Sequence, residues 1–232
     1  MKAVIKRGLN FLRHSHIKKD IRCKSKWFGN KYGGFYVIPS LIRKNAIVYS
    51  FGVGKDISFD RALINSFDCH IVAFDPTPDS ISWCKQQSLP EKFKLNDYGL
   101  SNKSEKVTFF LPKNKNHVSG SLVDHSKVSS KNTVTVKMKS FNDILKDLKH
   151  NTIDLIKMDI EGSEYNVVES VLCSDINISQ IVLEIHERFF HNGKEKTIKL
   201  LETFRKKGFL LHSISSSYEE LSFVNSKAIQ HI

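Results

Sequence analysis

The chain has 232 residues, of which 40% are hydrophobic, and its formal net charge is +12. This length and hydrophobic content predict one sizeable α/β domain and argue against disorder. No apolar run approaches the roughly 20 residues of a membrane span, and the basic start of the chain lacks the features of a signal peptide.

Positive charge is concentrated at the start of the chain. Residues 1–31 contain ten lysines and arginines and one acid, Asp20, so they carry +9 of the net +12. We therefore predict a basic N-terminal arm over residues 1–32, with an amphipathic helix at 3–14, and a main domain over residues 33–232. Such an arm suits an anionic partner, namely a membrane surface, a phosphorylated lipid carrier or nucleic acid. The alternative is a solvated helix that aids solubility.

Aromatic and glycine residues at 23–40 predict a structured lead-in or a lid. A buried strand is predicted at 46–51, and Gly52 and Gly54 end it. A helix is predicted to follow over 57–67. This order of strand, glycine turn and helix lets backbone N–H groups approach a ligand closely.

A second strand, predicted at 70–74, ends in Asp75. Asp75 follows the glycines by about twenty residues, where nucleotide-binding α/β folds place an acid for ribose hydroxyls. The third small residue of a dinucleotide fingerprint is replaced by Ile57, and no P-loop lysine follows. These departures argue against NAD, FAD and NTP hydrolysis.

The rest of the chain alternates helix and strand patterns, which predicts a doubly wound sheet. The predicted helices are 79–87, 140–149, 163–172 and 194–207, and the predicted strands are 93–96, 107–111, 133–138, 153–158, 180–186, 209–214 and 221–224. A polar segment at 113–131 contains His117, Ser119 and Ser121, which we predict as substrate contacts on a loop over the site.

Two carboxylates follow the strand at 153–158. Asp159 and Glu161 stand where that strand ends, and open α/β sheets bind their ligands at this edge. Ser163 is predicted to cap the next helix, with Glu164 in its first turn.

Four segments resemble the FkbM-type S-adenosylmethionine-dependent methyltransferase family, namely residues 48–60, 73–78, 98–101 and, most specifically, 153–164. The resemblance implies a class I methyltransferase fold, a Rossmann-like doubly wound sheet of seven strands. Its strand order would be 3-2-1-4-5-7-6, with the last strand antiparallel. It also implies methyl transfer, commonly to a hydroxyl of a sugar or a natural product.

The cofactor contacts implied by this resemblance are Ser50, Gly52, Gly54, Asp56, Asp75, Pro76, Asp97, Tyr98 and Asp159. Asp75 would bind the ribose hydroxyls, and Asp97 and Tyr98 would lie near the adenine. Many methyltransferases carry an acid two residues before the first glycine, but here that residue is Ser50. Either Asp56 or Asp159 is expected to supply the negative charge instead.

A sugar hydroxyl is a poor acid, so its methylation benefits from a base or a metal. Asp159, Glu161 and His186 are the catalytic candidates, because they lie at the ends of adjacent predicted strands. If the strand continues through Glu184 and His186, the two share one face. Asp159, Glu184 and His186 could then bind a divalent metal. The alternative is that Glu161 and Glu164 serve a helix N-terminus while His186 is a hydrogen-bonded core histidine.

The resemblance, together with these residues and the basic arm, implies an S-adenosylmethionine-dependent O-methyltransferase whose acceptor is a saccharide or a lipid-linked saccharide. A nucleic-acid methyltransferase that uses the basic arm is one alternative, although the chain lacks the Asn/Asp-Pro-Pro-aromatic motif of base-amino methyltransferases. A non-catalytic binding module is another, and Ser50 favours it. The four cysteines show no metal-ligand spacing, and we expect Cys69, Cys84 and Cys173 to lie reduced in the core. A reduced protein is expected to be cytoplasmic, and it would be peripheral at the membrane if the arm binds lipid.

Overall fold

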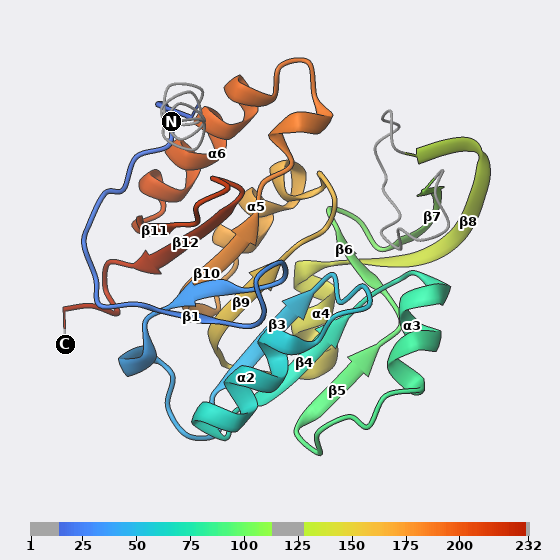
Figure 1. Cartoon of the computed structure of the whole chain (residues 1–232), viewed down its shortest axis with the longest axis horizontal. Coiled ribbons are helices and arrows are strands. Elements are labelled where there is room, and N and C mark those ends of the chain that lie inside the picture. The colour runs from blue at the N-terminus through green and yellow to red at the C-terminus, as the bar shows by residue number, and fades with distance from the viewer. Residues whose placement is uncertain (1–13, 113–127, 231–232) are drawn as a thin grey trace, which may run out of the picture.

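The computed structural model describes residues 14–112 and 128–230, and for residues 110–112 and 128–132 it describes the backbone alone. Its centre is a seven-stranded sheet (Figure 1), in the spatial order β5 (Phe93–Asn96), β4 (His70–Phe74), β3 (Ile47–Phe51), β9 (Thr152–Met158), β10 (Asn177–Glu184), β12 (Glu220–Asn225) and β11 (Phe209–Ile214). Numbered along the chain, these strands have the order 3-2-1-4-5-7-6. β12 runs antiparallel to both of its neighbours. The predicted class I methyltransferase topology is therefore confirmed.

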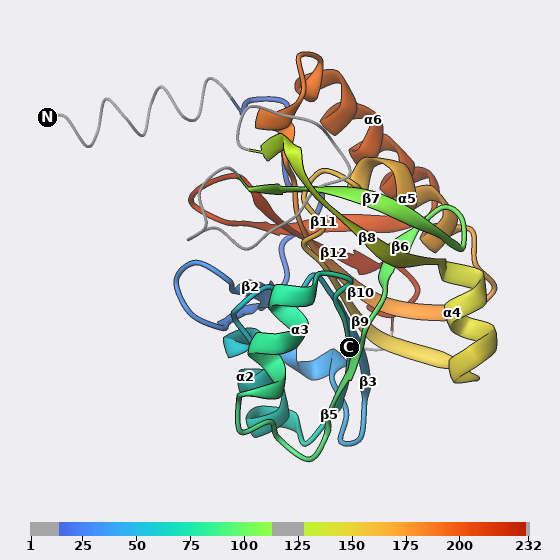
Figure 2. The ribbon, with the colours of Figure 1, turned by 90° about the vertical axis from the view of Figure 1, so that its right-hand side faces the viewer.

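Helices cover both faces of this sheet (Figure 2). One face carries α2 (Ser58–Phe67) and α3 (Pro78–Lys85), and the other carries α4 (Phe141–Leu148), α5 (Glu164–Leu172) and α6 (Gly193–Lys206). A separate hydrophobic cluster fills the space on each side of the sheet. The central strands are apolar in sequence because both of their faces are buried.

A second, three-stranded sheet stands beside the end of the main sheet, in the order β6 (Gly99–Ser101), β8 (Val128–Ser140) and β7 (Glu105–Pro112). The predicted strands at 107–111 and 133–138 are present and longer than expected. β8 begins inside the segment predicted to be a polar loop. The loop residues His117, Ser119 and Ser121 lie outside the described part of the chain, so their predicted substrate role stays a prediction.

The described part of the basic arm runs along the edge of the main sheet. Ile17 is buried, and the backbone N–H of Asp20 donates to the carbonyl of Leu211 on β11 at 2.8 Å. The arm continues into β1 (Lys26–Phe28), which pairs with β2 (Phe35–Val37) before η1 (Pro39–Leu41). Residues 14–25 form no helix, and most of the predicted helix at 3–14 lies outside the description. The division into an arm of 1–32 and a domain of 33–232 stays a prediction.

Two local expectations were wrong. Cys173 is exposed, although Cys69 and Cys84 are buried as predicted. Ser163 occupies the N-cap position of α5 without a side-chain capping bond. Instead, Glu164 turns back and accepts a hydrogen bond from the backbone N–H of Ile160 at 2.9 Å. Within residues 14–112 and 128–230, no helix has the length and apolar character to cross a membrane.

Candidate active site

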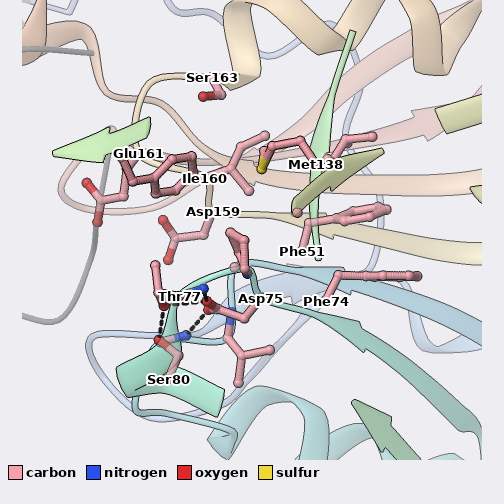
Figure 3. Close-up of a pocket in the computed structure, with 17 residues that line it drawn as sticks. Phe51, Phe74, Asp75, Thr77, Ser80, Met138, Asp159, Ile160, Glu161 and Ser163 are labelled. Atoms are coloured by element: carbon pink, nitrogen blue, oxygen red, sulfur yellow. Dashed lines mark hydrogen bonds between the residues drawn. The ribbon is translucent and has the colours of Figure 1, made fainter. Parts of the chain in front are cut away.

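A pocket opens at the carboxyl ends of β3, β4 and β9 (Figure 3). It is lined by Phe51, Gly52, Val53, Gly54, Phe74, Asp75, Pro76, Thr77, Ser80, Gly99, Leu100, Phe109, Met138, Asp159, Ile160, Glu161 and Ser163. The main sheet supplies a glycine turn and the acids, while the small sheet supplies Phe109 and Met138. The pocket is therefore polar on one side and apolar on the other.

The two glycines of the turn serve different purposes. Gly52 has a φ of +78°, and a Cβ at this position would overlap the carbonyl oxygen of Asp159. Gly52 is thus required for the close approach of β3 to the end of β9. Gly54 also has a positive φ, of +59°, but a Cβ there would meet no atom within 4 Å. The space over Gly54 belongs to the pocket.

Asp75 holds the glycine turn in place. Its Oδ2 accepts hydrogen bonds from the backbone N–H groups of Val53, at 3.0 Å, and Gly54, at 2.9 Å. Its Oδ1 accepts from the backbone N–H and the hydroxyl of Thr77, at 2.9 and 2.5 Å. The Ser80 hydroxyl lies 2.7 Å from that of Thr77. These four bonds use most of the acceptor capacity of a carboxylate, so Asp75 stabilises the pocket wall in addition to any contact with a ligand.

An acidic group surrounds His186 next to the pocket. The Nε2 atom of His186 lies 3.4 Å from Oε2 of Glu161, 3.5 Å from Oε1 of Glu184 and 3.8 Å from Oδ1 of Asp159. β10 ends at Glu184, and His186 is the N-cap residue of η2 (Glu187–Phe189). The strand thus stops before His186, yet the two side chains still meet.

The other nitrogen of His186 faces a fourth carboxylate. Nδ1 lies 3.0 Å from Oε1 of Glu164, and both side chains are almost completely buried. Burial lowers the pKa of His186, but Glu164 and the other nearby carboxylates outweigh this effect and raise it. Burial, and then the charge of Asp159, raise the pKa of Glu184. The group therefore retains protons more strongly than its components do in water.

Sequence reasoning missed Lys157, which lies on β9 and is buried. Its Nζ atom contacts the carbonyl oxygen of Gly52 and lies 3.8 Å from Oδ2 of Asp159. Burial raises the pKa of Asp60, and the positive charge of Lys157 opposes this rise without cancelling it. The available signal was the lysine within a largely apolar strand, because a buried lysine needs a partner.

The turn between β9 and α5 has an uncommon backbone. Glu161 has a φ of +52°, in the left-handed region that glycine prefers, and Gly162 follows with +94°. Left-handed backbone at a non-glycine residue is uncommon and frequently occurs at functional sites. This conformation places Glu161 beside both the pocket and His186.

The predicted site residues in the described part of the chain fall into two sets. Those that line the pocket are Gly52, Gly54, Asp75, Pro76, Asp159 and Glu161, and those that lie outside the lining are Ser50, Asp56, Asp97, Tyr98, Glu184 and His186. Of the two acids proposed for the cofactor's amino group, Asp159 lines the pocket. Asp56 instead accepts a hydrogen bond from the backbone N–H of Ser58, at 2.8 Å, at the start of α2.

Three predicted cofactor contacts have other neighbours. Ser50 is fully buried, and its side chain lowers the pKa of the Asp60 carboxylate. Asp97 lies 3.8 Å from the Nζ atom of Lys137. Tyr98 packs against Phe74, with ring centroids 5.5 Å apart. Gly99 and Leu100, which directly follow Tyr98, line the pocket. The cofactor contacts predicted for Asp97 and Tyr98 stay predictions.

Comparison with known proteins identifies relatives for most of the chain. The family described as Methyltransferase FkbM domain matches residues 50–211. A probable methyltransferase-like protein 24 of Rattus norvegicus is 24% identical over 189 residues, which are 77% of this chain and 45% of that protein. The hexuronic acid methyltransferase AglP of Haloferax volcanii is 26% identical over 139 residues, which are 58% of this chain and 54% of that protein.

This chain therefore spans about half the length of the curated relatives it matches. Among solved structures, a fibrillarin pre-rRNA processing protein of Methanococcus jannaschii covers 90% of this chain and 86% of its own, with a TM-score of 0.48 and 10% identity. That similarity is too low to add to what the strand order already establishes.

Proposed function

This chain belongs to the FkbM methyltransferase domain family, and from that premise we propose that it transfers a methyl group from S-adenosylmethionine to a hydroxyl of a saccharide. The observation that carries the proposal is the meeting of an open glycine turn with an acidic group at one edge of the sheet. The glycine turn suits a nucleoside-containing donor, and the acidic group suits deprotonation of an acceptor.

The pocket fits the proposed donor on two counts. The space over Gly54 is open, so a ligand can lie against the backbone there. Leu100, Phe109 and Met138 offer apolar contact for a base, while Thr77 and Ser80 offer hydroxyls near Asp75. S-adenosylmethionine, when bound, supplies an electrophilic methyl group on a sulfonium. Asp159 is the lining acid proposed to face its positive charge.

The acidic group is proposed to orient the acceptor and to take its proton. Asp159 and Glu161 line the pocket, and His186 lies behind them. A base within reach of the acceptor hydroxyl removes the proton as the oxygen gains its methyl group. The apolar wall formed by Phe109, Met138 and Ile160 limits access of water, which would compete for the methyl group.

A second pocket beside the acidic group supports a saccharide as the acceptor. Its lining includes the aromatic rings of Phe190 and Tyr218 and the polar side chains of His191 and Lys194. Aromatic faces combined with hydrogen-bond donors suit a sugar ring. The hexuronic acid named for the Haloferax volcanii relative motivates a uronic acid as the first candidate.

Calorimetric titration with S-adenosylmethionine tests the donor. We expect binding by the wild-type chain and at least tenfold weaker binding by Gly54→Ala, because a methyl group would occupy the open space of the turn. Gly208→Ala is the matched control, since Gly208 also has a positive φ, of +78°, but lies at the end of α6. Absence of binding by a folded wild type free of copurified cofactor would instead favour a non-catalytic module.

Transfer of a labelled methyl group tests the acceptor. We expect label on a saccharide that ends in a uronic acid, less on its neutral hexose analogue and none on single-stranded RNA. Labelling of RNA alone would support the nucleic-acid alternative and contradict the saccharide proposal.

A further inference from the structure

A histidine and two carboxylates beside the pocket have a spacing that suits a metal ion. One ligand atom from each of Asp159, Glu184 and His186 lies within 4.8 Å of the others. Nε2 of His186 lies 3.5 Å from Oε1 of Glu184 and 3.8 Å from Oδ1 of Asp159. Ligands about 2.1 Å from a shared metal lie roughly 3.0 to 3.5 Å apart at common bond angles. Small side-chain rotations would therefore complete the site.

Glu164 lies beside the nitrogen of His186 that is not part of this group. Its Oε1 atom is 3.0 Å from Nδ1, outside hydrogen-bond geometry. Nε2 is the nitrogen that faces Asp159 and Glu184. Glu164 has no solvent exposure and is itself held by the backbone N–H of Ile160. A buried carboxylate behind a histidine is the arrangement that commonly orients a metal-binding imidazole.

The charges around His186 also suit a divalent cation. The carboxylates of Asp159, Glu161, Glu164 and Glu184 all lie within 3.8 Å of a ring nitrogen of His186. Such a concentration of carboxylate oxygens around one buried imidazole favours a bound cation, because burying carboxylates without a compensating charge is costly.

We propose that Asp159, Glu184 and His186 bind one divalent cation of the Mn²⁺ or Mg²⁺ type. Carboxylate ligands suit Mn²⁺ and Mg²⁺, whereas imidazole is a ligand of transition metals, so Mn²⁺ fits this mixed set better than Mg²⁺. The role of the ion, though not its binding, rests on the proposed function: it would polarise the acceptor hydroxyl. The O–H bond of the acceptor would break, its proton would pass to Glu161, and the oxygen would form the new bond to the methyl carbon as the carbon–sulfur bond breaks.

Titration of the tag-free 232-residue chain with Mn²⁺ tests this proposal. The protein is first stripped with a chelator, and free Mn²⁺ is followed by electron paramagnetic resonance without S-adenosylmethionine or acceptor. We expect one Mn²⁺ per chain and at least tenfold weaker binding by Asp159→Asn and by Glu184→Gln. Glu164→Gln, which alters only the residue that positions His186, should weaken binding about tenfold.

Glu187→Gln is the matched control, because Glu187 directly follows His186 but its carboxylate lies 2.9 Å from Nε2 of His16. We expect it to change Mn²⁺ affinity less than twofold. No Mn²⁺ binding by the folded wild type, or equal weakening by Glu187→Gln and Glu184→Gln, would overturn the proposal. A chain that binds Mn²⁺ but not S-adenosylmethionine would refute the proposed function and leave the metal site standing.

Discussion

Glu161 combines a strained backbone with a position at the site. Its φ of +52° is a conformation that side chains with a Cβ disfavour by about 1 kcal/mol or more. The same residue lines the pocket and contacts His186. A residue with this backbone cost is expected to be retained for its carboxylate rather than for stability.

This strain predicts a difference between two substitutions. Glu161→Gly should be more stable than Glu161→Ala by about 1 kcal/mol, because both remove the carboxylate but glycine alone adopts the left-handed backbone without cost. Urea unfolding measures the difference. At Glu169, exposed within α5, the order should reverse, with glycine less stable than alanine by about 1 kcal/mol. Equal stability of the two Glu161 variants would contradict the argument.

His212 on β11 predicts a loss of stability in acid. Burial, with a smaller effect of Lys19, lowers the pKa of His212 from 6.5 to about 4. Between these values the unfolded chain binds a proton that the folded chain does not. Folding stability is therefore lost as the pH falls from 6.5 to 4, by about 3 kcal/mol in total.

Urea unfolding at pH 7 and at pH 4.5 measures this effect. A His212→Gln variant should lose much of the pH dependence over that range. His191→Gln, which changes a histidine that lines the second pocket, should retain it. An unchanged pH dependence in His212→Gln would show that other groups cause the loss.

The sequence allowed several site residues to be selected, but it did not predict which residues they contact. Gly52, Asp75 and Asp159 could be selected because each ends a strand at the edge where ligands bind. The contact of Lys157 with the carbonyl of Gly52 could not be predicted, because it depends on the register between β9 and β3. The left-handed backbone of Glu161 likewise has no signal in the sequence.

At the scale of elements, Asp20 fastens the arm to the main sheet. Its carboxylate accepts from the backbone N–H of Leu211 and from Nε of Arg205, each at 2.9 Å. Asp20→Ala should therefore cost about 1 to 2 kcal/mol, because it leaves both donors without this acceptor. Thermal unfolding measures the loss. Asp175→Ala, at an exposed turn position, should change stability by less than about 0.5 kcal/mol.

The ranges of helices and strands were predicted more accurately where the pattern of apolar residues is clearer. β4, β5 and β11 match their predicted ranges. β4 and β11 are largely apolar, and β5 alternates apolar and polar residues as a strand does. β8 was predicted too short, because its first residues are polar and lie in a small sheet with little buried surface. The contribution of Phe109 and Met138 to the pocket depends on how that small sheet sits, which local pattern does not determine.

At the scale of the whole molecule, strand order brings together what the sequence separates. Asp159 and His186 lie 27 positions apart, yet β9 and β10 are neighbours and end at one edge. The prediction that they meet needed only a parallel sheet and two strand ends. The other residues that surround Asp159 and His186 are positioned by loops, and the sequence did not predict the conformation of those loops.

The basic surface is also a property of the whole molecule. The lysines and arginines at positions 18, 19, 22, 24, 26 and 31 are all exposed along the described part of the arm. Deleting residues 1–31 would also remove Ile17 and Asp20, which stabilise the fold. Substitutions are therefore a cleaner test of the proposed contact with an anionic membrane.

We expect Lys→Gln substitutions at Lys18, Lys19 and Lys24 together to weaken binding to phosphatidylserine vesicles at least tenfold at low salt, since each lysine near such a surface contributes about 1 kcal/mol. Vesicle sedimentation measures the loss. The control is the same substitution at three exposed lysines elsewhere, Lys85, Lys94 and Lys103. Equal losses in both triple variants would attribute binding to net charge rather than to the arm.

The close approach at Gly52 joins the two halves of the site into one unit. The backbone N–H of Asp159 donates to the carbonyl of Phe51 at 3.0 Å, and Lys157 spans the Gly52 carbonyl and the Asp159 carboxylate. We expect a ligand that shifts the glycine turn to shift Asp159 as well. If occupancy of one half changes the affinity of the other, thermodynamic linkage requires the same factor in both directions.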